Sequence, residues 1–191
     1  MMKIFLDMDG VIVDSVLPAM RMHGADLTSE HHYPDGFNWD IVGATNYIYA
    51  RDCPHLPCME VSYEDFWKAL DFQWWSSLKP YPWAGLFIQE VEKYGEVRLA
   101  TAVVTASGCV AGKYMWVKKN LPQYLDTLHI GNIKSDFAQE GTLLIDDRDK
   151  NCEDFIAAGG AAILVPRAWN KRGHHENPFE VALDELDKLC N

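Results

Sequence analysis

The stretch KIFLDMDGVIVDS, residues 3–15, decides the fold. It holds an apolar run at residues 4–6, then Asp7 and Asp9, with a glycine directly behind them. A short apolar run that stops at Asp-Gly is typical of a buried parallel strand, so residues 3–8 are predicted to form one. Alternate residues of an extended chain share a face, which puts both carboxylates on the same side. Because like charges repel and lose hydration in the interior, the pattern predicts a compensating cation.

The second half of the chain alternates between strand-like and helix-like segments. The expected strands are residues 96–101, 127–131, 141–147 and 161–166, and the expected helices are residues 84–94, 107–121, 151–160 and 178–190. This alternation indicates βαβ units and a doubly wound α/β fold, in which helices cover both faces of a parallel sheet. Ligands of such sheets bind beyond the carboxyl ends of the strands, where we therefore expect the functional site.

Residues 15–80 have a different character. They are rich in aromatic residues, proline and histidine, and they contain only short amphipathic segments. In the segment SYEDFWKAL, residues 62–70, Ser62 is the expected N-cap and Asp65 stands at the third helical position. We predict that residues 15–80 form a small helical cap inserted after the first strand, and that residues 1–14 and 81–191 form the α/β core.

Polar side chains stand where three of the predicted strands end. Asp7 and Asp9 lie at the end of the first strand, Thr101 closes the second, and Asp146 and Asp147 close the segment TLLIDD. In a parallel sheet these ends meet at one edge, so the five side chains should converge. Oxygen ligands suit Mg²⁺, which also binds phosphate. We expect the four carboxylates to hold Mg²⁺.

A lysine is also expected to offset these carboxylates, and the candidate is Lys113 in the predicted helix 107–121. Each feature has a purely structural alternative. Lys113 could lie on a solvated helix face, Asp7 and Asp9 could belong to a turn, and the later Asp pair could begin a helix. Their order along the chain and their joint position at strand ends favour a functional site.

Four motifs together resemble those of the haloacid-dehalogenase-like phosphohydrolases: DMDGV at residues 7–11, Thr101, Lys113 and LLIDD at residues 143–147. The likeness narrows in the segments SLKPYPWAG, GCVAGKYMWVKKNLP and TLLIDDRDKN, which are similar to stretches of the 5′(3′)-deoxyribonucleotidases. This closer resemblance covers residues 72–151. It implies an α/β hydrolase core, a Mg²⁺ cofactor and phosphomonoesterase activity.

The resemblance also implies catalytic roles. Asp7 would be the nucleophile that forms an aspartyl-phosphate, and Asp9 would protonate the leaving oxygen and then activate water. Thr101 would bind a phosphoryl oxygen, and Lys113 would neutralise charge beside Asp7. These roles suit an anionic substrate, because a phosphate monoester repels a carboxylate nucleophile unless cations screen its approach.

Further residues would bind the metal and the substrate. The resemblance implies that Asp146 binds Mg²⁺ directly and that Asp147 holds a metal-bound water or Lys113. The backbone amides from Met8 to Gly10 are candidate donors to phosphate, since glycine permits close approach. Trp67 occupies a place similar to a base-stacking tryptophan of the nucleotidases, although the cap aromatics also suit a small hydrophobic core.

One position departs from the family pattern. The nucleotidases usually follow the motif threonine with Ser-Pro, whereas Ala102 and Val103 follow Thr101 here. A hydroxyl donor near the substrate is therefore missing, although Ala102 still belongs to the expected substrate-binding set. Thr105 or Ser107 could replace the hydroxyl, and Thr105 is also an alternative for the motif threonine itself.

The totals limit the partners. The net charge is −11 and no Lys/Arg-rich run occurs, which argues against a polynucleotide partner. Five scattered cysteines, the lack of a leader pattern and the lack of a membrane-length apolar run lead us to expect a cytoplasmic protein without a membrane partner. The sequence leaves both a monomer and a homodimer open.

The expected function is Mg²⁺-dependent hydrolysis of a small phosphomonoester, with a deoxyribonucleoside monophosphate as the first-choice substrate. The alternative within the same superfamily is a phosphatase for a sugar phosphate or an organic-acid phosphate. A non-catalytic nucleotide-binding relative is the alternative from another class. It has no need for a nucleophile such as Asp7, so metal-dependent turnover separates the two.

Overall fold

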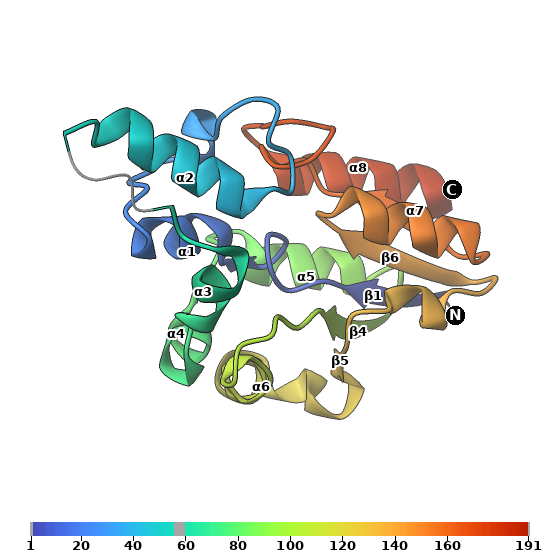
Figure 1. The fold of residues 1–191 in the computed structure, drawn as a ribbon. Helices are drawn as coiled ribbons and strands as arrows, with labels where there is room; N and C mark the ends of the chain where they lie inside the picture. The colour runs from blue at the N-terminus through green and yellow to red at the C-terminus, as the bar shows by residue number, and fades with distance from the viewer. Residues whose placement is uncertain (1, 56–59, 191) are drawn as a thin grey trace.

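The computed structural model describes residues 2–55 and 60–190, which leaves Cys58 outside the described residues. A five-stranded parallel sheet lies at its centre, in the order β5-β4-β1-β6-β7 (Figure 1). The strands are β1 (Met2–Leu6), β4 (Gly95–Thr101), β5 (His129–Ile130), β6 (Thr142–Asp146) and β7 (Ala161–Leu164). The predicted doubly wound α/β fold is therefore confirmed. Among the described residues, no helix is both long enough and apolar enough to span a membrane.

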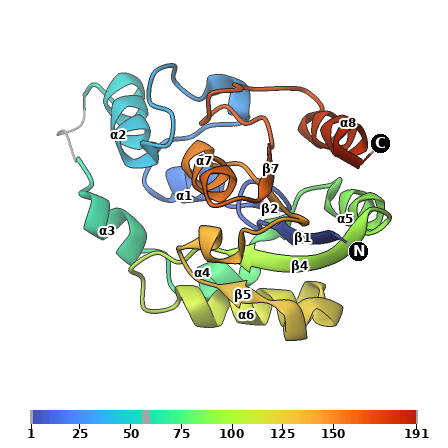
Figure 2. The same cartoon turned by 90° about the vertical axis from the view of Figure 1, so that its right-hand side faces the viewer.

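Apolar side chains alternate between the two faces of the sheet, and helices cover both faces. Ile4 and Leu6 of β1 belong to the larger core cluster, which also takes side chains from α5 (Ala84–Glu92), α6 (Cys109–Asn120) and α8 (Pro178–Cys190). Phe5 points to the other face, where it packs with Phe155 of α7 (Asp149–Ala157). Figure 2 shows α5 and α8 on one side of the strands and α7 on the other. This alternation is the period of two that a strand requires.

The chain between the first sheet strand and α5 forms a helical body. A two-stranded antiparallel ribbon, β2 (Val13–Asp14) with β3 (Lys79–Pro80), marks its two ends. Between them lie α1 (Val16–Met22), η1 (Glu30–His32), α2 (Ile41–Asp52), α3 (Tyr63–Lys68) and α4 (Phe72–Ser77). These helices lie beside the sheet in Figure 1 and contribute most of a second hydrophobic cluster, which also includes Cys109 of α6 and Trp169. This arrangement supports our proposal that residues 15–80 form a cap.

The short helix α3 begins as its sequence predicts. Ser62 is the N-cap, and its Oγ accepts a hydrogen bond from the amide of Asp65 at 3.1 Å. That bond satisfies a backbone donor which the first helical turn leaves unpaired. The N-cap at Ser62 defines where α3 starts and so defines the position of Trp67 on this helix.

Several strand boundaries differ from the predicted ones, and two of these differences matter for the site. β1 ends at Leu6, so Asp7 is the first residue beyond the strand, although its amide still donates to the carbonyl of Ile145 at 2.9 Å. β5 contains only His129 and Ile130, because the preceding residues form the 3₁₀ helix η2 (Pro122–Thr127). A second 3₁₀ helix, η3 (Lys134–Phe137), follows β5 and returns the chain along the carboxyl edge of the sheet.

Candidate functional site

Three buried carboxylates meet at the carboxyl ends of the adjacent strands β1 and β6. Asp7 follows β1, while Asp146 ends β6 and Asp147 comes directly after it. One oxygen of each lies within 4.8 Å of the other two. Their exposed fractions are 5%, 0% and 1%. Three ionised carboxylates can lie this close together in a buried site only if positive charge offsets them.

The ammonium group beside Asp7 belongs to Lys134, at the start of η3. Its Nζ lies 2.8 Å from Asp7 Oδ1 and 2.5 Å from Asp146 Oδ2. Lys113 was predicted at this place, and that prediction is wrong. Lys134 escaped notice because it stands in an irregular segment between two strands, where no helical or strand period draws attention to it. The available signal was a lone lysine twelve residues before Asp146 on the same sheet edge.

Lys113 is nevertheless buried in the site, on the side of Asp9. It reaches out from α6, and its Nζ forms a salt bridge with Asp9 Oδ2. It also donates to Thr101 Oγ1 at 2.9 Å and to the carbonyl of Ala102 at 2.5 Å. The alternative of a solvated helix face is therefore wrong. Asp9 itself, expected among the metal ligands, turns its carboxylate to Lys113 and lies outside the group of three.

Burial changes the acidity of two of these carboxyl groups. The pKa of Asp7 rises from 3.8 to about 7, because burial penalises its charge and Asp146 and Asp9 repel it, while Lys134 opposes the rise. The pKa of Asp147 is raised well above its usual value, first by burial and then by the charges of Asp146 and Asp7. Burial alone would lower the pKa of Lys134, but the two carboxylates that it contacts raise it instead.

The donor set fits a divalent cation. Asp147 Oδ1 is buried and, within the described residues, has no hydrogen-bond partner. The other oxygen of Asp147 accepts from Trp169 Nε1 at 2.7 Å, which fixes the orientation of the carboxylate. Three carboxylates with the one ammonium of Lys134 leave an excess of negative charge, and hard oxygen ligands of this kind suit Mg²⁺.

Two side chains outside the predicted site residues hold Asp146 and the turn at Gly10 in place. Asn151 Nδ2 donates to both oxygens of Asp146, at 3.2 and 3.0 Å. The buried Arg167 donates from Nε to the carbonyl of Gly10 and forms an ion pair with Glu30 at 3.2 Å. Asn151 lies in the first turn of α7, and Arg167 lies in the loop after β7.

Gly10 lets the chain turn tightly beneath Asp147. Its φ is +72°, and a Cβ atom there would lie 1.7 Å from Asp147 Oδ2. Two of the amides expected to bind phosphate already have partners: the Gly10 amide donates to the carbonyl of Val13 at 2.9 Å, and the Met8 amide donates to Asp7 Oδ1 at 2.7 Å. These two amides therefore shape the turn, and the expectation that they are open donors is wrong.

An aromatic-walled cavity of about 420 Å³ opens above the carboxylates. Its floor includes Asp7, Asp9 and Lys113. The aromatic residues that line it come from the helical body: Trp39, Tyr63, Trp67, Trp74 and Trp75. A cavity with charged groups at one end and flat apolar walls elsewhere is the kind that holds a small molecule with an anionic group and a planar part.

The structure brings two of the four predicted substrate-binding residues, Trp67 and Ala102, to this cavity. Trp67 is half-buried and lines it, packed edge-on against Phe66 at a centroid distance of 4.9 Å. Ala102 and Thr105 line it from the loop after β4. Ser107 is exposed and is not among the lining residues of the described chain. Thr101, at the end of β4, is the threonine that contacts Lys113.

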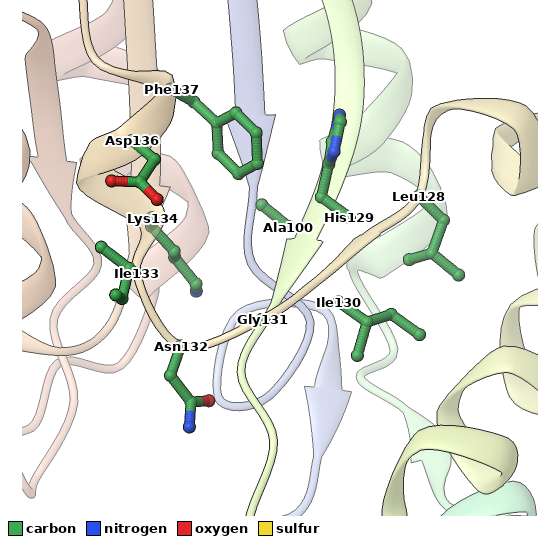
Figure 3. A pocket seen from close by; sticks show the side chains of 10 residues that line it. All are labelled: Ala100, Leu128, His129, Ile130, Gly131, Asn132, Ile133, Lys134, Asp136 and Phe137. Carbon is green, nitrogen blue, oxygen red and sulfur yellow. The ribbon is translucent and has the colours of Figure 1, made fainter.

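A second cavity, of about 440 Å³, lies at the edge of the sheet near β5 and η3 (Figure 3). His129 and Phe137 line it with ring centroids 4.5 Å apart, and Ile133 stands exposed at its rim. Asn132 and Lys134 line it as well. Asn132 also lines the first cavity, so it separates the two.

Comparisons with known proteins agree with this architecture. No protein-family model matches the sequence, and no curated protein matches it significantly. Among solved structures, the chain is similar to a haloacid-dehalogenase-like family hydrolase from Xanthomonas campestris, with a TM-score of 0.57 and 14% identity over 100% of this chain and 93% of that one.

Two further structures show the same likeness. YfnB from Bacillus subtilis, described as a HAD-hydrolase, gives a TM-score of 0.56 and 11% identity over 100% of this chain and 98% of that one. A dehalogenase solved as an intermediate complex gives a TM-score of 0.51 and 12% identity over 99% of this chain and 96% of that one. At such identities the likeness concerns architecture. The chain has the fold of the haloacid-dehalogenase-like hydrolases.

Proposed function

We propose that the protein is a Mg²⁺-dependent phosphomonoester hydrolase, and that its substrate is a deoxyribonucleoside monophosphate. One observation carries the proposal: Asp7, Asp146 and Asp147 form a buried group with Lys134 beside it, and two of its carboxylates, Asp7 and Asp147, line an aromatic-walled cavity. Among the similar structures, YfnB was solved bound to magnesium, which agrees with this choice of cation.

The contacts of Asp7 support its role as the nucleophile. Its Oδ1 accepts from the Met8 amide and lies beside Lys134 Nζ, so Oδ2 is the oxygen available for attack on phosphorus. Attack forms an aspartyl-phosphate and breaks the ester P–O bond. When bound between the carboxylates, Mg²⁺ supplies positive charge that keeps Asp7 ionised and offsets the charge of the phosphate.

Asp9 is placed to serve as the acid and then the base. It gives a proton to the departing alcohol oxygen, and it later takes a proton from the water that attacks the aspartyl-phosphate. That second step releases inorganic phosphate and regenerates Asp7. The salt bridge with Lys113 and the contact with Thr101 Oγ1 at 3.4 Å orient the carboxylate of Asp9.

The cations divide the work of neutralising charge. Lys134 stands beside the nucleophile, and Lys113 stands beside the acid and Thr101. Lys113 also lies over the ring of Trp75, 4.8 Å from its centroid, which ties the helical body to the charged floor. Lys113 lines the cavity and Lys134 acts through its contact with Asp7, so a phosphoryl group bound at Asp7 would be attracted by both positive charges.

The preference for nucleotides rests on the walls of the cavity. Five aromatic side chains line it, and a nucleobase offers a flat face for stacking, which a sugar phosphate lacks. The preference for deoxyribose rests on the resemblance to the 5′(3′)-deoxyribonucleotidases. A sugar phosphate or an organic-acid phosphate is the second candidate substrate for the same chemistry.

A phosphate-release assay over a substrate panel tests the proposal. The panel contains deoxyribonucleoside and ribonucleoside 5′- and 3′-monophosphates, sugar phosphates and para-nitrophenyl phosphate, each with Mg²⁺ and with excess chelator. Chloride release from 2-chloropropionate tests a dehalogenase in parallel. We expect chelator-sensitive phosphate release that is fastest with deoxyribonucleotides and absent in Asp7→Asn. Full activity in Asp7→Asn, or halide release alone, would refute the proposal.

A further inference from the structure

Asn132 is held at the carboxyl edge by the pairing of the last two strands on that side. β5 pairs with β4 so that Ile130 stands opposite Thr101, and the amide of Gly131 continues the ladder by donating to the Thr101 carbonyl at 2.9 Å. The next residue, Asn132, therefore lies beside the loop that follows Thr101. It stands two residues before Lys134, whose ammonium is held by Asp7 and Asp146, and directly after Gly131, whose amide is held by Thr101.

One end of the Asn132 side chain fastens that loop. Its Oδ1 accepts a hydrogen bond from the amide of Val103 at 2.7 Å. The carbonyl of the preceding residue, Ala102, accepts a hydrogen bond from Lys113 Nζ. Asn132 and Lys113 therefore contact neighbouring residues of the same loop. Figure 3 shows the side chain of Asn132 extending away from Ala100, His129 and Phe137.

The other end of the side chain carries hydrogen-bond donors. Since Oδ1 is taken by Val103, the NH₂ group on the same carbon has two N–H groups to offer. Asn132 lines the cavity that contains Asp7, Asp9 and Lys113. The adjoining residues 102–104 are Ala-Val-Val and bring no side-chain donor, although the sequence resemblance implies a hydroxyl donor directly after Thr101.

We propose that Asn132 binds the substrate, with Nδ2 donating a hydrogen bond to a phosphoryl oxygen and Oδ1 holding the loop at Val103. Asn132 thus supplies the uncharged donor that Ala102 cannot supply. The inference rests on the proposed phosphomonoesterase function and adds a residue to its substrate site.

The variants Asn132→Asp and Asn132→Ala separate this role from a structural one. Asn132→Asp keeps the size and the oxygen that accepts from Val103, but it replaces the donor with a negative charge. We expect kcat/KM for para-nitrophenyl phosphate to fall about tenfold or more, mainly through KM, with little change in melting temperature. Ala102→Ser in the Asn132→Ala background should restore part of the loss, because it returns a donor to the same place.

The matched control is Ile133→Asp, which adds the same charge one residue along, on an exposed side chain outside the first cavity. It should retain wild-type kinetics. The affinity for inorganic phosphate in the presence of Mg²⁺, followed by tryptophan fluorescence, should fall in Asn132→Asp and not in Ile133→Asp.

Three results would overturn the inference. Asn132→Asp within twofold of wild type would show that only the bond to Val103 matters, and equal losses in Ile133→Asp would show a general charge effect. If the wild-type protein neither hydrolyses a phosphomonoester nor binds phosphate, the proposed function fails and the inference fails with it. That last result is separate from the first two, in which the wild type is active.

Discussion

Lys134 Nζ lies 2.8 Å from Asp7 Oδ1, inside a space where both side chains are almost fully buried. The same ammonium lies 2.5 Å from Asp146 Oδ2, so one lysine bridges the ends of the adjacent strands β1 and β6. This bridge makes Lys134 the group on which the charge balance of the acidic cluster depends. Lys113 balances Asp9 separately.

Lys134→Met should reduce phosphate release by about 100-fold or more, because loss of a preorganised charge stabiliser costs about 3 kcal/mol of barrier. The same change should tighten Mg²⁺ binding, since the carboxylates lose a competing positive charge. Turnover rates and Mg²⁺-dependent shifts in melting temperature measure the two effects. Lys150→Met, at an exposed lysine of α7 paired with Asp154, is the control and should change neither. Wild-type turnover in Lys134→Met would contradict the role given to the bridge.

The metal-free protein should lose stability as the pH rises from about 4 to about 7. The pKa of Asp7 is about 7 in the folded protein, raised by burial, against 3.8 for the ordinary group. Between these values the folded state binds more protons than the unfolded state, so the free energy of unfolding decreases with pH. Above pH 7 both states have lost this proton, and the decrease from Asp7 ends.

Urea unfolding of the chelated protein at several pH values measures this dependence. Mg²⁺ should restore more stability at pH 8 than at pH 5, since it binds the ionised carboxylates. Asp7→Asn is the matched variant, because it cannot titrate and should flatten the slope between pH 4 and 7. An unchanged slope in Asp7→Asn would show that another group causes it.

Gly10→Ala should unfold the turn beneath Asp147 or displace that carboxylate. The φ of +72° disfavours any side chain, and the new Cβ would lie 1.7 Å from Asp147 Oδ2. Gly141→Ala is the control for the backbone term, because Gly141 has a φ of +80° but no atom within 4 Å of an added Cβ. It should cost about 1–2 kcal/mol and keep full activity. Gly10→Ala should cost more and abolish turnover, as measured by urea unfolding and phosphate release. Equal losses in the two variants would mean that the close approach to Asp147 has no consequence.

Residues at the ends of regular strands and helices could be predicted from the sequence, whereas residues in irregular segments could not. Asp7, Asp146 and Asp147 could be predicted to meet, because the ends of parallel strands share an edge and the strands themselves read clearly from their apolar runs. Ser62 could be predicted as a cap for a similarly local reason. Lys134 and Arg167 could not, since each lies in an irregular segment whose path depends on tertiary packing rather than on a local pattern.

Lys113 could be assigned to a helix from the sequence, but the carboxylate that it contacts could not be predicted. A helical period located the residue on α6, but only the crossing of α6 against the strand ends determines which carboxylate its four-carbon side chain reaches. The reach is to Asp9 and Thr101. In the same way, the sequence indicated an aromatic-rich segment, but the packing of α3 and α4 decides which rings face the cavity.

Trp67→Ala tests whether the half-buried ring on α3 recognises a base. Loss of one base–aromatic contact is worth about 1–3 kcal/mol, which corresponds to a fall of roughly 5- to 150-fold in kcat/KM for nucleotides. Para-nitrophenyl phosphate should be affected much less, because the walls of the cavity are built for a larger planar group. Tyr47→Ala removes an exposed ring of α2 that does not line the cavity, and it should leave both substrates unaffected.

The ratio of the two kcat/KM values, rather than either value alone, carries the result of the Trp67 experiment. Trp67 packs against Phe66 and Tyr63, so its removal can loosen α3 and slow every substrate together. An equal fall for nucleotides and para-nitrophenyl phosphate would therefore assign Trp67 to the core of the helical body and end the stacking hypothesis. A selective fall for nucleotides would place the base against α3. If sugar phosphates outrun every nucleotide with the wild-type protein, the cavity serves a different phosphomonoester, and the same acidic floor then belongs to a sugar or organic-acid phosphatase.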